Sequence, residues 1–258
     1  MLSSQILGIL DTYSCKKKLV GQSYDGAAVM SGAHGGVQAK IREICPMAFF
    51  IPCYAHILNL VLSRTLENIS ELKAFFGHVN SIVRFFNKST KRSNLLKKVA
   101  DRRLPGVSDT RWHYHSRIIN VIFNSKLDLV ETFNLILNNP QEWDGDALST
   151  AENLLQKLED MEFSFLLHTF SEIFSKTDIL FALVQNKQVD VEVAMREIQS
   201  FELWMTVQFI NKFDSIFESV QNCNDNPRKR RRNNSDTDLK TCYRRLFIEI
   251  KDNIIRKD

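Results

Sequence analysis

The chain contains little glycine and proline, with 9 and 5 of these residues among 258. Turn-rich β architectures depend on both residues, so their scarcity favours long helices. The sequence also lacks a basic start that leads into an apolar signal segment, and it lacks an apolar run long enough to cross a bilayer. We therefore expect a soluble, intracellular protein with no membrane partner.

A disulfide framework is also excluded, because the cysteines are odd in number and irregular in spacing. They are Cys15, Cys45, Cys53, Cys223 and Cys242. The net charge of +4 is too small to indicate a nucleic-acid partner unless the positive charge is clustered. The length and the 44% hydrophobic content allow one large domain or two modest ones.

Two short blocks lie near the start of the chain, at residues 19–32 and 49–62. In each block an apolar run is followed by polar residues and then by apolar residues at helical spacing. These blocks predict strands at 19–23 and 48–51. In an α/β sheet, side chains that follow the strands gather at the carboxyl edge, where ligands usually bind. We therefore expect Asp25, Cys53 and His56 to lie at this edge.

The rest of the sequence is dominated by apolar residues at helical spacing. Asp178 is expected to cap the start of a new helix. Further helices are predicted at 3–13, 37–44, 53–66, 71–100, 116–137, 149–174, 178–185, 191–220 and 241–255.

Asp25 is the best candidate for a catalytic group. A carboxylate at a strand end, beside small residues, suits a two-metal phosphoryl-transfer site, although such a site needs several carboxylates. The ordinary alternative is that Asp25 only caps the following turn.

Cys53 and His56 are three residues apart, on one face of a predicted helix. A zinc site would need a second ligand pair, and His34, Cys45 and His78 do not provide one. A buried thiol and a hydrogen-bonded imidazole are therefore the favoured interpretation.

Two further segments have features of nucleic-acid contacts. Arg111 and Trp112 follow a basic stretch, and this pair could bind a phosphate and stack on an unpaired base, or the Trp could pack at a helix start. The run Arg228-Lys229-Arg230-Arg231-Arg232 lies in a polar segment and indicates a nuclear-import signal, a nucleic-acid contact or a solvated loop. Nuclear import is the simplest functional interpretation of the run.

These motifs, in this order, resemble the transposase-derived region of the hAT superfamily, and above all the hAT-like segment of MYM-type zinc-finger proteins. The resemblance rests on Gly21-Gln22-Ser23-Tyr24-Asp25-Gly26-Ala27-Ala28-Val29-Met30-Ser31-Gly32, on Cys53-Tyr54-Ala55-His56-Ile57-Leu58-Asn59-Leu60-Val61 and on Thr110-Arg111-Trp112. The segment Cys242-Tyr243-Arg244-Arg245-Leu246-Phe247 is similar to the one that follows the family's helical insertion.

The resemblance implies a predominantly helical α/β protein with an incomplete ribonuclease-H-like core that a long α-helical insertion interrupts. The expected division is 1–68 for the partial core, 69–221 for the insertion, 222–240 for a basic disordered loop and 241–258 for the start of a returning core helix. Asp25 would correspond to the second of three metal-binding carboxylates, Cys53 and His56 to active-site support, and Trp112 to a DNA contact. The first aspartate, the catalytic glutamate, the zinc finger and the dimerisation segment have no counterpart that we can align.

We therefore expect a domesticated or fragmentary hAT-type protein that is catalytically inactive and acts as a nuclear module binding nucleic acid or protein. No cofactor is expected, and Mg²⁺ or Mn²⁺ at Asp25 is expected only of an active enzyme. The expected partners are DNA, a second copy of the chain or other nuclear proteins. The alternatives are an active metal-dependent strand-transfer enzyme and a helical scaffold without a DNA role.

Overall fold

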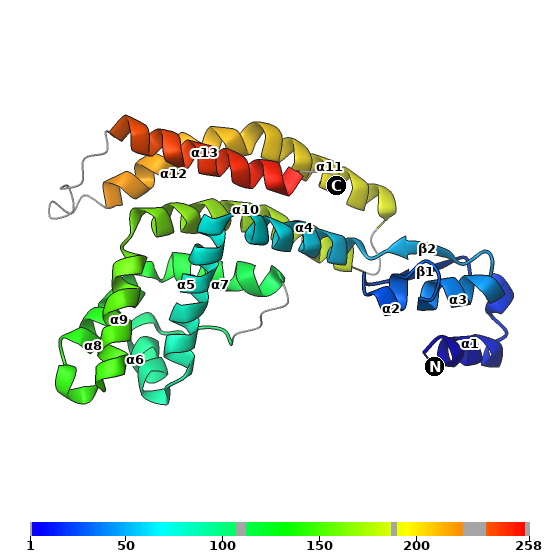
Figure 1. The fold of residues 1–258 in the computed structure, drawn as a ribbon, viewed down its shortest axis with the longest axis horizontal. Coiled ribbons are helices and arrows are strands. Elements are labelled where there is room, and N and C mark those ends of the chain that lie inside the picture. The colour runs from blue at the N-terminus through cyan, green and yellow to red at the C-terminus, as the bar shows by residue number, and fades with distance from the viewer. Residues whose placement is uncertain (1, 107–111, 187–189, 224–235, 256–258) are drawn as a thin grey trace. The chain divides into compact units, whose positions relative to one another are not determined.

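The structure is a computed structural model that describes residues 2–106, 112–186, 190–223 and 236–255. Within these ranges it is predominantly helical and contains one sheet, made of two parallel strands (Figure 1). The predicted helical class is therefore confirmed. The chain divides into an N-terminal unit, Met1–Val61, and a helical unit, Leu62–Asp258.

The N-terminal unit is built around a strand–helix–strand crossover. Strand β1 pairs in parallel with β2, so that Gly21 lies opposite Phe49 and Tyr24 lies opposite Pro52. The elements in order are α1 (Leu2–Thr12), the 3₁₀ turn η1 (Lys16–Lys18), β1 (Gly21–Tyr24), α2 (Ala28–Ser31), α3 (Val37–Ile44), β2 (Phe49–Pro52) and the first part of α4 (Tyr54–Asn68). Parallel strands need such a crossover because a tight turn cannot join them.

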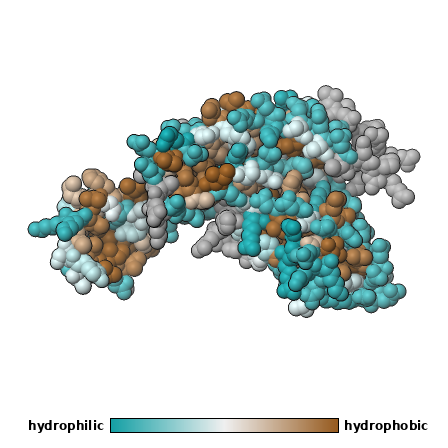
Figure 2. All heavy atoms as spheres, turned by 180° about the vertical axis from the view of Figure 1, so that it is seen from behind, coloured by the Kyte–Doolittle hydropathy of each residue, from teal (hydrophilic) through white to brown (hydrophobic). Residues whose placement is uncertain are grey.

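The core of this unit lies where α1 and α3 pack together. It consists of Val37, Ile41, Cys45 and Ala48, with partly buried residues of α1 packed against it. Other apolar residues of the unit remain at its surface (Figure 2), and β2 leaves Phe49 53% exposed.

The helical unit is organised around its longest helix, α10 (Met161–Gln185). In Figure 1, α11, α12 and α13 run along one side of α10, while α5, α7 and α9 contact it elsewhere. The remaining elements are α5 (Ser70–Asn87), α6 (Thr90–Ala100), α7 (Trp112–Asn124), α8 (Lys126–Leu137), η2 (Pro140–Glu142), α9 (Gly145–Leu158), α11 (Val191–Leu203), the π-helix η3 (Trp204–Gln208), α12 (Phe209–Cys223) and α13 (Asp236–Ile255).

Phenylalanine fills much of the core of the helical unit. The rings of Phe209 on α12 and Phe247 on α13 stack with their centroids 4.2 Å apart. Phe165 and Phe170 of α10 are fully buried. Because apolar burial is the main favourable contribution to folding, these rings hold the helices together. Among the helices that the structure describes, none combines the length and the apolar character that a membrane span requires.

Three of the predicted long helices are divided into shorter ones. The predicted helix 71–100 breaks at Lys88, and Ser89 caps α6 by accepting a hydrogen bond from the backbone N–H of Arg92. The predicted helix 149–174 ends at Leu158, and Asp160 caps α10. The predicted helix 116–137 breaks at Ser125. Periodicity continues across such breaks because the helices on both sides face a common core.

The predicted helix start at Asp178 is wrong, because α10 continues through this residue to Gln185. The Asp178 carboxylate instead accepts a 2.5 Å hydrogen bond from the Ser116 hydroxyl on α7. A tertiary partner has therefore replaced the local backbone partner that a cap would use. Helix α13 begins at Asp236, before the predicted start at Thr241, and much of the predicted loop 222–240 lies outside the described residues.

Candidate functional site

Asp25 and Cys53 lie side by side at the carboxyl edge of the two-stranded sheet. Each directly follows the last residue of its strand, and these last residues, Tyr24 and Pro52, are partners in the strand register. The Cys53 backbone N–H also donates to the Tyr24 carbonyl at 3.1 Å. Parallel pairing thus produces the juxtaposition that the two sequence blocks predict.

His56 joins these two residues from the first turn of α4. A Cβ atom added at Gly26 would lie 2.7 Å from the His56 Nε2 atom, so the imidazole packs directly against the glycine backbone. A side chain at residue 26 would therefore displace the ring from this position. The structure therefore brings Asp25, Cys53 and His56 to one end of the sheet.

The Asp25 carboxylate is exposed, and its Oδ1 atom accepts a hydrogen bond from the Ala27 backbone N–H at 3.3 Å. This contact is the turn-capping arrangement that was the ordinary alternative for Asp25. In the described ranges, no group of three or more His, Cys, Asp or Glu side chains could hold a metal ion. A two-metal site needs several carboxylate ligands, and Asp25 by itself supplies one.

Sequence reasoning assigned no role to Gln22, which lies in β1 below this edge. Its buried Nε2 group donates to the carbonyls of Gln38 and Ala48, at 3.0 and 2.9 Å. These bonds tie β1 to α3 and to the residue before β2. The sequence feature that could have identified this role is a polar side chain inside a predicted strand. Nearby, burial raises the pKa of the Tyr24 phenol, whose ring stacks on Phe50.

The candidate DNA-contact and import residues lie mostly outside the described residues. This holds for Arg111 and for the whole run Arg228 to Arg232. Trp112 is the first residue of α7. The proposed roles of these residues stay predictions.

A second candidate site is the basic segment, residues 88–103, which comprises α6 and its flanks. It holds seven Lys and Arg residues and one acidic residue, whereas the whole chain has a net charge of only +4. Two of the cations have aromatic partners: the Lys91 ammonium lies 4.2 Å from the Trp143 ring centre, and the Arg92 guanidinium lies 4.2 Å from that of Phe85.

Other cations of the basic segment are exposed and not neutralised. Lys97, Lys98 and Arg102 have no carboxylate partner within the part of the chain that the structure describes. Arg103 contacts the neutral amide oxygen of Asn94 at 3.0 Å. Clustered positive charge of this kind attracts a polyanion, because little of it is spent on internal ion pairs.

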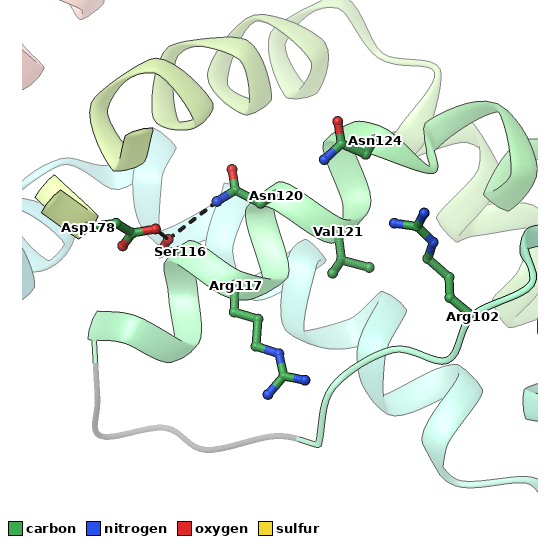
Figure 3. Close-up of a pocket in the computed structure, with 7 residues that line it drawn as sticks. All are labelled: Arg102, Ser116, Arg117, Asn120, Val121, Asn124 and Asp178. Atoms are coloured by element: carbon green, nitrogen blue, oxygen red, sulfur yellow. Dashed lines mark hydrogen bonds between the residues drawn. The ribbon is translucent and has the colours of Figure 1, made fainter. Parts of the chain in front are cut away.

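Arg102 also lines a pocket of about 270 Å³ beside α7 (Figure 3). The other lining residues are Ser116, Arg117, Asn120, Val121, Asn124 and Asp178. Five of them belong to α7 and one to α10, so the helix packing of this unit forms the pocket.

Comparison with known proteins gives no assignment for either site. No protein-family model matches the chain, and no solved structure is significantly similar to it.

Proposed function

We propose that this chain is a catalytically inactive, hAT-transposase-derived nuclear protein that binds nucleic acid through its helical unit. The observation that carries the proposal is the basic segment, whose exposed cations Lys97, Lys98 and Arg102 lack carboxylate partners among the described residues. Phosphate contacts by lysine and arginine supply most of the affinity of sequence-independent nucleic-acid binding.

The N-terminal unit supports the family part of the proposal. Of the residues in the matching motifs, Asp25, Cys53 and His56 follow two paired parallel strands, and Gly26 leaves room for the approach of His56. We infer that this unit is an incomplete ribonuclease-H-like core and that the helical unit corresponds to the family's insertion. Asp25 alone then catalyses nothing, because two-metal chemistry requires further carboxylates.

The binding experiment uses the full chain and a labelled DNA duplex, with affinity measured over a range of salt concentrations. The variant Lys97→Gln/Lys98→Gln/Arg102→Gln should bind more weakly, and the slope of log K against log salt should fall in magnitude by about 2 to 3. The control is Lys17→Gln/Lys18→Gln/Lys40→Gln, which removes the same charge from exposed positions of the N-terminal unit.

If both triple variants bind like the unaltered chain, the basic segment is not the binding surface and the proposal fails. The absence of salt-sensitive binding by the unaltered chain would favour a helical protein scaffold instead. Metal-dependent nicking of a duplex by the chain, abolished by Asp25→Asn, would refute the inactive assignment and favour a strand-transfer enzyme.

Nuclear import is tested separately. A fluorescent fusion of the chain should accumulate in the nucleus, and replacement of Arg228–Arg232 by glutamine should abolish that accumulation. Nuclear accumulation that is unchanged by the replacement would rule out this run as the signal.

A further inference from the structure

The pocket beside α7 is built from two adjacent rows of side chains. Ser116, Asn120 and Asn124 follow one another at intervals of four residues, and Arg117 and Val121 form the neighbouring row. From Ser116 to Asn124 the helix rises about 12 Å. The pocket is therefore elongated along α7, and a ligand that contacts both ends must have a similar length.

One end of the pocket is acidic and has a free acceptor. The Asp178 Oδ2 atom accepts a hydrogen bond from Ser116, which also lies 3.5 Å from the Asn120 amide nitrogen. The Asp178 Oδ1 atom is buried, yet it has no hydrogen-bond partner among the residues that the structure describes. Buried carboxylate oxygens are nearly always paired, so this atom requires a donor from a ligand or a solvent molecule.

The other end of the pocket is cationic. Figure 3 shows the Arg102 guanidinium group beside Val121 and Asn124, while Asp178 lies at the opposite end. Arg102 is exposed, and no ion pair joins it to another described residue, whereas Arg117 follows Ser116 and lies toward the Asp178 end (Figure 3). An unpaired guanidinium group at one end of a pocket suits a phosphate, which arginine binds through paired hydrogen bonds.

We propose that this pocket binds a single nucleotide whose base carries an exocyclic amino group. The amino group donates to Asp178 Oδ1, and the phosphate contacts Arg102. Cytosine is the smallest base with an exocyclic amino group, so CMP is the ligand that tests the proposal in this pocket of about 270 Å³. The proposal extends the proposed nucleic-acid binding, because the nucleotide can be free or can be an unpaired residue of a strand.

Two simpler ligands do not match this geometry. Inorganic phosphate would leave Asp178 Oδ1 without a donor. An α-amino acid with an apolar side chain carries its ammonium and carboxylate groups on one carbon atom, so it cannot reach both ends of the pocket. A nucleotide has its base edge and its phosphate at opposite ends, as the pocket requires.

The test is a titration of the full chain with CMP and UMP, followed by calorimetry or NMR. The two nucleotides differ where cytosine has an amino donor and uracil a carbonyl acceptor, so CMP should bind at least about tenfold more tightly. Arg102→Gln should weaken CMP binding by about tenfold, since it removes a charged phosphate contact. Lys97→Gln is the control, because it removes the same charge outside the pocket lining.

Asp178→Asn distinguishes recognition from a structural role. The Ser116 hydroxyl can still donate to the asparagine oxygen, which directs the amide N–H₂ group toward the ligand. The variant should therefore weaken CMP binding and strengthen UMP binding, which simple destabilisation cannot do. Equal binding of CMP, UMP and ribose 5-phosphate, or an unchanged preference in Asp178→Asn, would overturn the proposal.

The source of the nucleotide is decided with short single strands. Tighter binding of oligo(dC) than of CMP, with weak binding of oligo(dT), assigns the pocket to an unpaired residue of a strand. Equal binding of oligo(dC) and CMP assigns it to a free nucleotide, and both outcomes support the pocket. If the basic-segment variant loses duplex binding while Asp178→Asn leaves nucleotide preference unchanged, this inference fails and the proposed function stands.

Discussion

Gln22 should determine the stability of the sheet edge that carries Asp25 and Cys53. Its buried amide donates two hydrogen bonds, to the carbonyls of Gln38 and Ala48. In the described part of the N-terminal unit, no other side-chain hydrogen bond connects β1 to residues on both sides of the crossover. Replacing Gln22 by methionine keeps the length of the side chain but removes both donors. We expect a loss of about 1 to 3 kcal/mol, since a buried carbonyl is left without its partner.

The assay is amide hydrogen exchange of the intact chain, read on peptides that cover the strands, because it reports local opening of one unit. The expected loss corresponds to exchange about 5- to 150-fold faster in Gln22→Met than in the unaltered chain. The control is Gln5→Met, which makes the same change at an exposed position of α1. Equal protection in Gln22→Met and the unaltered chain would refute the reasoning, as would an equal effect of the control.

The variant Gln22→Glu tests the direction in which the stability of this site changes with pH. A carboxyl group facing two carbonyls in a buried site is favoured in its protonated form, so its folded pKa should exceed the ordinary value of about 4.3. The folded state then binds more protons than the unfolded state. The variant should therefore be closest to the unaltered chain below about pH 4.3 and lose further stability as the pH rises through the raised folded pKa. A loss that does not change with pH would contradict this account.

Two further predictions concern the helical unit. Phe247→Ala removes a buried ring that stacks on Phe209, so chemical denaturation should show a loss of about 3 to 5 kcal/mol, whereas the adjacent, 40% exposed Ile248→Ala should cost far less. Similar losses for the two variants would show that α13 does not dock through Phe247. Burial, and then the charge of Lys126, lower the folded pKa of His168, so stability should fall as the pH drops below about 6.5, and His168→Gln should reduce that dependence. A pH profile that the substitution leaves unchanged would refute the role of His168.

The location of the sheet-edge residues could be predicted from the sequence alone. Apolar runs that end before Asp25 and Cys53 predict strands, and a helical pattern between them predicts a parallel crossover, which places both strand ends at one edge. The helical class followed from periodicity and from the scarcity of glycine and proline.

Other features were decided only by tertiary packing. Asp178 has the local sequence of a helix cap, but its partner is Ser116, 62 residues away, which no local rule identifies. The breaks at Ser89 and Asp160, by contrast, come from local capping inside a continuous apolar pattern, which periodicity alone does not reveal. The partners of Gln22 and the pocket beside α7 exist because separate segments pack together. Local sequence therefore determined the elements and the strand ends, whereas the contacts that give buried polar groups their partners required the folded chain.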